Sequence, residues 1–390
     1  MTVPLQPSVA VPDALTTGSA ASAVAPAPAG PPAPVEFPLG WMLDHAPAPL
    51  RYRAASEVGR LPADVVRRLE WLPLAHPPAI TLALAQHPDG SWGDSMLGVP
   101  SAELPWPGGV GTIQAARRLL EYGWDRETPP LLRARRLLFR LLAEDEDPAY
   151  LFEFARDATD EDLIRRGRLI LREAAAATLA QAGYQHDPRL RGAALRIVER
   201  IAVYLRSPLA QKPWVRVGNR QVLAADAAPP SIFALTMLAH MPLFRSEHSE
   251  SLDRIYGYVT QHLPRQESVQ LVGDHLVEQP HLVLGDPLPH RNAVDADVPS
   301  AVAWLELAAR LGFLRRCEHW TKLFERFLED RGRDGVWHPH KGQETPRTEN
   351  PYVWPLFPLG EPNDGSAVRA SVTFRLGLIA RLSGRPIELR

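Results

Sequence analysis

Cysteine is almost absent from this 390-residue sequence, in which Cys317 stands alone. A single thiol excludes a disulfide within the chain and a zinc site built from several cysteines. Sparse cysteine is also typical of proteins in reducing compartments, where disulfides rarely persist. We therefore expect a cytoplasmic protein.

Long apolar runs and N-terminal positive charge are lacking as well. A membrane-spanning helix needs about 18 apolar residues in a row, and no such run is present. The first basic residue is Arg51, so the charged start of a secretory signal is missing. The 43 Lys and Arg nearly balance the 45 Asp and Glu, for a net charge of −2. We therefore expect neither a spanning segment nor a nucleic-acid partner.

Aromatic residues do not occur before Phe37, in a region rich in Pro, Ala, Ser and Thr. Such a segment buries too little apolar surface to offset the entropy that it would lose on ordering. We therefore expect residues 1–38 to be a disordered tail. The remaining residues, 39–390, are then predicted to form one domain with an ample core.

Helical periodicity dominates the sequence beyond Trp41. Apolar residues recur at spacings of three and four in residues 187–205, 300–313 and 365–383, and weaker versions occur along the rest of the chain. Each stripe predicts one buried helix face. Alternating strand patterns are scarce, with residues 269–272 and 281–284 as the short candidates. The expected fold class is all-α.

A heptapeptide at residues 86–92, QHPDGSW, joins two of the predicted helices. Asp89 and Gly90 predict a tight turn, because glycine accepts the positive φ that the turn needs. We expect Trp92 to fold back on the preceding helix and Gln86 to bond backbone groups left unpaired at a helix end.

A second, partial copy of this motif precedes the last predicted helix. It consists of Asp334, Gly335 and Trp337, with Arg331 in the place of the glutamine.

The Q-x-x-D-G-S-W string resembles the repeat of squalene–hopene cyclases and their relatives in the terpenoid cyclase and protein prenyltransferase superfamily. In those proteins it occurs at helix junctions of an α/α barrel. The resemblance covers roughly residues 40–385. It implies an α/α toroid, a barrel of helix pairs, and an isoprenoid or other apolar small molecule as partner. The alternative interpretation of the same residues is an incidental Asp-Gly turn with a buried tryptophan.

Terpenoid cyclases that start by protonation carry a D-x-D-D motif whose middle aspartate is the general acid. By resemblance, Asp297 takes the place of the acid and Asp295 that of its neighbour, whereas Val298 replaces the third acidic residue. Such an acid must stay protonated in an apolar cavity, where desolvation and a nearby carboxylate raise its pKa. Asp297, with Pro299 after it, equally predicts a helix N-cap. The two roles are compatible.

Seven tryptophans are candidates for the lining of a cavity that stabilises a carbocation, because aromatic faces attract cations. They are Trp71, Trp92, Trp106, Trp124, Trp304, Trp337 and Trp354.

The sequence contains no recognisable motif for binding a cofactor or a metal. Dinucleotide and P-loop fingerprints are lacking, so we expect no cofactor. Zinc prenyltransferases have an aspartate two positions before their cysteine, but Arg315 precedes Cys317 here. His338 and His340 have no evident third ligand, and we expect no metal.

Three functions stay open at this point. The first is a terpenoid-cyclase-like protein in which Asp297 protonates an isoprenoid. The second is a non-catalytic toroid that serves as a binding or scaffolding module. The third is a helical barrel acting on saccharides, which needs two carboxylates about 5 to 10 Å apart. Its loop candidates are Glu103, Asp286, Asp297 and Glu349.

Overall fold

The predicted helical stripes form helices in the computed structural model. The structure describes residues 33–143, 160–263, 268–290, 297–340, 346, 348, 350–360 and 364–390. Helices α9 (Pro188–Arg206), α14 (Val298–Leu311) and α16 (Gly365–Leu382) occupy the three strongest stripes. Each buries the apolar face that its periodicity indicated. These three helix predictions are confirmed.

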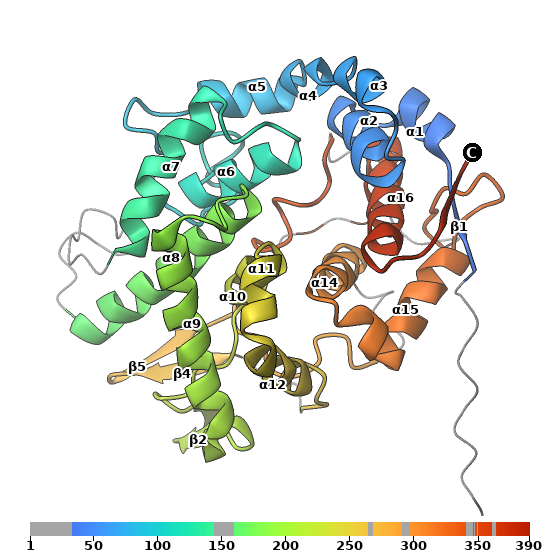
Figure 1. Cartoon of the computed structure of the whole chain (residues 1–390). Coiled ribbons are helices and arrows are strands. Elements are labelled where there is room, and N and C mark those ends of the chain that lie inside the picture. The colour runs from blue at the N-terminus through green and yellow to red at the C-terminus, as the bar shows by residue number, and fades with distance from the viewer. Residues whose placement is uncertain are drawn as a thin grey trace, which may run out of the picture. The chain divides into compact units, whose positions relative to one another are not determined.

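Short helices make up the N-terminal part of the described chain (Figure 1). They are α1 (Leu39–His45), α2 (Ala48–Arg53), the π-helical turn η1 (Ala54–Val58), α3 (Ala63–Arg67), α4 (Trp71–Leu74), α5 (Pro77–Leu84), α6 (Thr112–Glu121) and α7 (Pro129–Leu142). Proline lies in the first turn of α2, α5 and α7. Its fixed φ and missing N–H suit that position, which explains how a proline-rich chain stays helical.

The helices from α8 onward supply many of the buried apolar residues. The remaining helical elements are α8 (Glu161–Gln181), η3 (Pro208–Ala210), α10 (Ile232–Ala239), α11 (Pro242–Glu247), α12 (Ser249–Val259), η4 (Leu314–Arg316) and α15 (Glu318–Glu329). Alanines 174–177 of α8 are all buried. Because their side chains are small, α10 packs closely along α8. Asp160 and Ser231 cap the first turns of these two helices.

The predicted fold class, an all-α toroid, is wrong. Helices account for about 54% of the chain and strands for about 8%. One sheet pairs β1 (Val35–Phe37) with β6 (Ile387–Leu389) in parallel. The other has the order β2-β3-β4-β5, formed by Trp214–Val217, Arg220–Leu223, Val269–Val272 and His275–Glu278. The chain thus has mixed helix and sheet content.

The missed strands gave little local signal. Strands β2 and β3 form a hairpin whose turn contains Gly218 with φ 60°, but their faces are mostly exposed or half-buried and do not alternate. Strands β1 and β6 have three residues each and pair across almost the whole chain. Of the two predicted strand candidates, Val269–Val272 is confirmed as β4. Residues 281–284 form only an isolated bridge, from Leu282 to Ser231.

The β1–β6 pair lies partly in the segment predicted to be a disordered tail. Val35 and Phe37 are buried, so the ordered part of the chain begins before residue 39. Residues 1–32 of the predicted tail lie outside the described residues.

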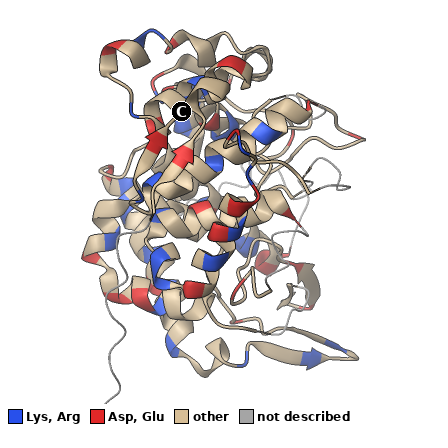
Figure 2. Ribbon diagram, turned by 90° about the vertical axis from the view of Figure 1, so that its right-hand side faces the viewer, with Lys and Arg blue, Asp and Glu red and all other residues tan. Residues whose placement is uncertain are grey.

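Helix α16, near the C-terminus, packs against helices from both the N-terminal and the C-terminal parts of the described chain. It packs against α1, α2 and η1 on one side and against α14 and α15 on the other, as Figure 1 shows. Arg381 of α16 donates to the carbonyl of Val58, through Nε at 3.0 Å and through Nη2 at 2.5 Å. Basic and acidic segments are interspersed along the ribbon (Figure 2), in keeping with the near balance of charge.

The QHPDGSW motif forms a corner between α5, α6 and α7. Trp92 is buried, its indole Nε1 donates to the carbonyl of Leu82 in α5 at 2.7 Å, and its backbone N–H donates to Thr112 Oγ1 at 3.0 Å. Gln86 Nε2 donates to the carbonyl of Pro130 in α7 at 2.8 Å. The contact of Trp92 with α5 agrees with the role that the sequence indicated. Gln86 instead donates to a carbonyl in the first turn of α7, which is not a group left unpaired at a helix end.

The partial copy builds a similar corner before α16. Trp337 is buried, and its backbone N–H donates to Thr373 Oγ1 at 3.0 Å. Gly335 has φ 76°, matching the positive φ of Gly90 in the first copy. The Nε1 atom of Trp337, however, is buried without a hydrogen-bond partner among the described residues. The indole N–H is therefore hydrogen-bonded in the first corner and has no described partner in the second.

This difference generates a paired prediction. Trp92→Phe removes the indole N–H that donates to the Leu82 carbonyl, whereas Trp337→Phe removes an N–H that has no partner in the described chain. We expect Trp92→Phe to lower the free energy of unfolding by about 1–3 kcal/mol more than Trp337→Phe. Urea unfolding followed by circular dichroism measures both. Equal losses, or a larger loss for Trp337→Phe, would contradict the assigned role of the indole.

Candidate functional site

A partly enclosed cavity of about 240 Å³ lies beside α10 and α14. Much of its wall is apolar and comes from two loops and α14, with Leu282, Val283, Leu284, Leu307, Val353 and Leu356 among its lining residues. The polar lining is concentrated on α6, α8, α10 and α14. An apolar cavity with a few convergent polar groups is the usual form of a small-molecule site.

The loop at residues 350–358 is held in place by side chains of α6. Gln114 Nε2 donates to the carbonyl of Pro351 at 2.8 Å. Arg118 donates to the carbonyls of Trp354 and Pro358, and its guanidinium lies 5.0 Å from the ring centroid of Trp354. Because Val353 and Leu356 belong to this loop, α6 positions one wall of the cavity.

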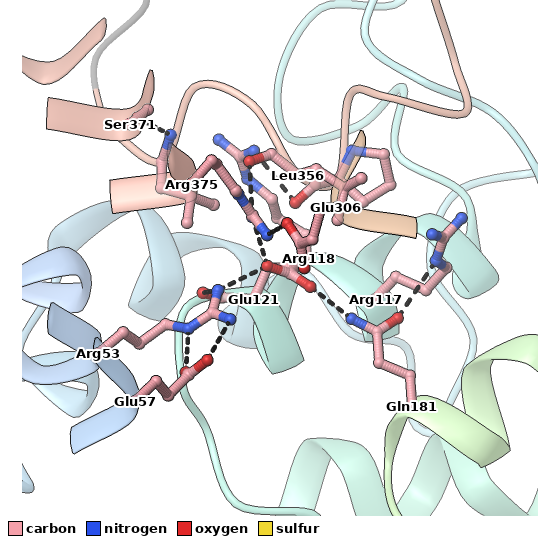
Figure 3. Close-up of polar contacts among 12 residues, drawn as sticks. Arg53, Glu57, Arg117, Arg118, Glu121, Gln181, Glu306, Leu356, Ser371 and Arg375 are labelled. Carbon is pink, nitrogen blue, oxygen red and sulfur yellow. Dashed lines mark hydrogen bonds and ion pairs between the residues drawn. The ribbon is translucent and has the colours of Figure 1, made fainter. Parts of the chain in front are cut away.

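Glu121, the last residue of α6, is the centre of a buried ion-pair network (Figure 3). Its Oε2 atom accepts from Arg53 Nη1 and from Arg375 Nη2, both at 2.5 Å. Its Oε1 atom accepts from Gln181 Nε2 at 2.6 Å. One carboxylate thus connects α2, α6, α8 and α16.

Glu306 of α14 extends the network on the other side of Arg375. It accepts from Arg375 Nη1 at 2.6 Å and from Arg310 Nε at 2.9 Å. Arg375 also donates to the carbonyl of Leu356 at 3.0 Å. The guanidinium of Arg375 therefore bridges the two cavity carboxylates and one wall of the cavity.

The network keeps both cavity carboxylates ionised. Burial alone would raise the pKa of Glu121, but the charges of Arg375 and Arg53 outweigh it and hold the pKa well below its usual value. Burial likewise opposes the ionised form of Glu306, and Arg375 with Arg310 lowers its pKa in spite of that. At neutral pH these groups can accept hydrogen bonds but have no proton to give.

Arg117 of α6 is the cavity guanidinium without a carboxylate partner among the described residues. Its Nε atom donates to Gln181 Oε1 over a long 3.4 Å. Burial lowers the pKa of Arg117 to about 10, with the charge of Glu121 opposing, so the side chain is still a cation at pH 7.

Two histidines of the cavity wall are neutral at pH 7. Burial lowers the pKa of His240 to about 4, and the charge of Arg310 acts in the same direction. Burial also lowers the pKa of His281 to about 3, helped by Arg166 and Arg200. The His240 Nδ1 atom lies 3.0 Å from the carbonyl of Thr236 in the preceding helical turn.

The predicted acid Asp297 lies at the start of α14 and is not among the residues that line the cavity. Its Oδ1 atom accepts from the backbone N–H of Ser300 at 3.0 Å, and its Oδ2 atom accepts from the Ser300 hydroxyl at 2.6 Å. These contacts are those of a helix N-cap. Asp295 lies outside the described residues.

The other acidic candidates that the structure describes, Asp286 and Glu103, do not line the cavity. Asp286 is buried and accepts from Trp320 Nε1 at 2.9 Å and from the backbone N–H of Leu288 at 2.8 Å. Glu103 is exposed on a loop, and Glu349 lies outside the described residues. None of the described candidates for saccharide hydrolysis is therefore among the residues that line the cavity.

The histidines near the second corner contact nearby acidic side chains. His338 Nε2 lies 3.2 Å from Asp334 Oδ2, and His340 Nε2 lies 3.4 Å from Asp330 Oδ2. Within the part of the chain that the structure describes, no group of three or more His, Cys, Asp or Glu side chains is placed to hold a metal ion.

Sequence reasoning missed the charged residues that shape the cavity. A usable signal was present, because Glu306 lies between Leu305 and Leu307, and Arg375 between Phe374 and Leu376, within apolar helix sequences. Isolated charges in an apolar helix must be paired if they are buried. The sequence alone does not show which acid meets which base.

Comparison with known proteins adds no relative. No family model matches the chain, and neither a curated protein nor a solved structure resembles it significantly. The likeness to squalene–hopene cyclases thus rests on the QHPDGSW motif and stays a prediction. None of the helices in the described ranges is long and apolar enough to cross a membrane.

The neutral histidines make stability depend on pH. Their folded-state pKa values lie below the value of about 6.5 in an unfolded chain, so the unfolded state binds more protons between those limits. The contribution of these two histidines to the free energy of unfolding is therefore fully present above about pH 6.5 and is lost as the pH drops. We expect each histidine to remove roughly 2 kcal/mol between pH 7 and pH 5.

Substitution separates these two contributions. We expect His240→Asn and His281→Phe each to flatten the dependence of the unfolding free energy on pH over this range. The matched control is His186→Asn at an exposed position, which should leave the slope as in the parent. Unchanged slopes in both cavity variants would contradict the burial of neutral histidines here.

Proposed function

We propose that this chain binds an apolar or amphipathic small molecule in the cavity beside α10 and α14. The observation that carries the proposal is the combination of a largely apolar wall with carboxylates that are already saturated by arginines. Such a site gains free energy from removing apolar ligand surface from water. This corresponds to the binding-module alternative rather than to proton-initiated catalysis.

The acid–base character of the cavity supports binding over protonation. An acid that protonates an alkene must be neutral before it reacts, whereas Glu121 and Glu306 are held ionised by their arginine partners. Burial raises the pKa of the cavity residue Tyr352 to about 12, which makes its phenol a weak proton donor. Asp297 does not line the cavity, and both its carboxylate oxygens accept from Ser300, which does.

The aromatic content of the wall points the same way. Of the seven tryptophans considered as cation-stabilising residues, Trp304 alone is among those lining the cavity. Its ring packs edge-on against Trp320, with centroids 5.5 Å apart. Trp71, by contrast, is largely exposed. A single indole supports packing against an apolar ligand better than stabilisation of a carbocation from several sides.

A neutral apolar fluorophore tests the proposal directly. N-phenyl-1-naphthylamine becomes fluorescent in apolar surroundings and carries no charge at pH 7. We expect it to bind the full chain at one saturable site and to be displaced by octan-1-ol. Ala303→Phe introduces a ring at the cavity wall. This variant should bind the fluorophore about tenfold or more weakly than the parent, because the ring occupies the space that the ligand fills.

The matched control places the same side chain at the surface. Val203 is exposed on α9, and Val203→Phe should bind the fluorophore as the parent does. Thermal unfolding verifies that both variants fold. The proposal is wrong if the parent shows no saturable binding, or if folded Ala303→Phe binds with the affinity of the parent.

A further inference from the structure

We infer that the ligand of this cavity carries one carboxylate and that Arg117 binds it. The inference rests on the proposed function, because it names the chemical class of the molecule bound at that same site. Arg117 then orients the ligand, and the apolar wall contacts the remainder of the molecule.

Arg117 is buried on the cavity wall with a single long hydrogen bond to the described residues. The residue is only 3% exposed. Its side chain lines the cavity and donates from Nε to Gln181 over 3.4 Å. Within the described part of the chain, its two terminal nitrogens have no hydrogen-bond partner. Figure 3 shows the guanidinium directed away from Glu121, with Gln181 between them. A buried guanidinium in this state is costly unless a ligand pairs with it.

The network and the cavity lining contain more guanidiniums than carboxylates. Four guanidiniums, those of Arg53, Arg117, Arg310 and Arg375, belong to the network or to the lining of the cavity. Three carboxylates, those of Glu57, Glu121 and Glu306, face them. Every one of these carboxylates is already paired with an arginine other than Arg117. One positive charge of this set remains, that of Arg117, and it lies on the cavity wall. The neighbouring Arg118 is not in the lining and donates to backbone carbonyls.

Arginine chemistry selects the kind of anion. The planar guanidinium offers parallel N–H donors that match the two oxygens of a carboxylate. His240 and His281, on the same cavity wall, are neutral at pH 7 and add no positive charge. A single cation beside ionised Glu121 suits a monoanion better than a doubly charged phosphate, because the second charge would be buried without a partner.

The experiment compares octanoate with octan-1-ol, which share a chain length and differ in the head group. Both are titrated against the bound fluorophore at pH 7. We expect octanoate to bind the parent about tenfold more tightly than octan-1-ol, the equivalent of a charge-assisted hydrogen bond. Inorganic phosphate should not displace the fluorophore at the same concentrations.

Two variants at position 117 separate charge from geometry. Arg117→Met should abolish the preference for octanoate and leave octan-1-ol within about twofold of the parent, since the apolar contacts remain. Arg117→Lys keeps the charge but loses the paired donors, and should retain part of the preference. Arg206→Met, at an exposed position on α9, is the control and should behave as the parent.

The outcomes distinguish this inference from the proposed function. If the fluorophore and octan-1-ol bind but octanoate binds no better than octan-1-ol, the assignment of a carboxylate is overturned while the proposed function survives. It is also overturned if folded Arg117→Met keeps the octanoate preference, or if phosphate competes better than octanoate. If no probe binds the parent, both proposals fail together. Should neither variant fold, the octanoate preference of the parent decides the question.

Discussion

The carboxylate of Glu121 is the constraint on which the rest of this structure depends. It is buried at the end of α6 and joins arginines from α2 and α16 to a glutamine of α8. Removing two such charges from water costs several kcal/mol for each ion, and only close pairing offsets that cost. The helices that supply the partners are therefore held at fixed separations around one point, and Arg375 extends the arrangement to Glu306 on α14.

This network and burial together set the charges in the cavity. Its carboxylates stay ionised, its histidines stay neutral, and Arg117 is left with a charge that no described acid balances. These charges fit the proposed binding of an amphipathic anion, because the cavity carboxylates Glu121 and Glu306 are held ionised rather than protonated. The apolar walls contributed by loops 280–287 and 350–356 complete the proposed site.

The sequence predicted local structure well and long-range structure poorly. Helices α9, α14 and α16 and strand β4 follow from periodicity within the segment, and the packing of Trp92 follows from a turn next to a helix. The β1–β6 pair joins residues about 350 positions apart, and the partners of Glu121 come from separate helices. Periodicity and spacing carry no information about such pairings, so both the sheets and the cavity charges were missed.

A double-mutant cycle on Glu121 and Arg375 tests the central claim most directly. The free energy of unfolding is measured by urea denaturation for the parent, Glu121→Gln, Arg375→Met and the double variant. Each single variant breaks a buried ion pair and leaves the network with one uncompensated charge, and should lose about 3–5 kcal/mol. The double variant restores the charge balance and should lose at least about 2 kcal/mol less than the sum. Losses below about 1 kcal/mol, or losses that simply add, would contradict the account.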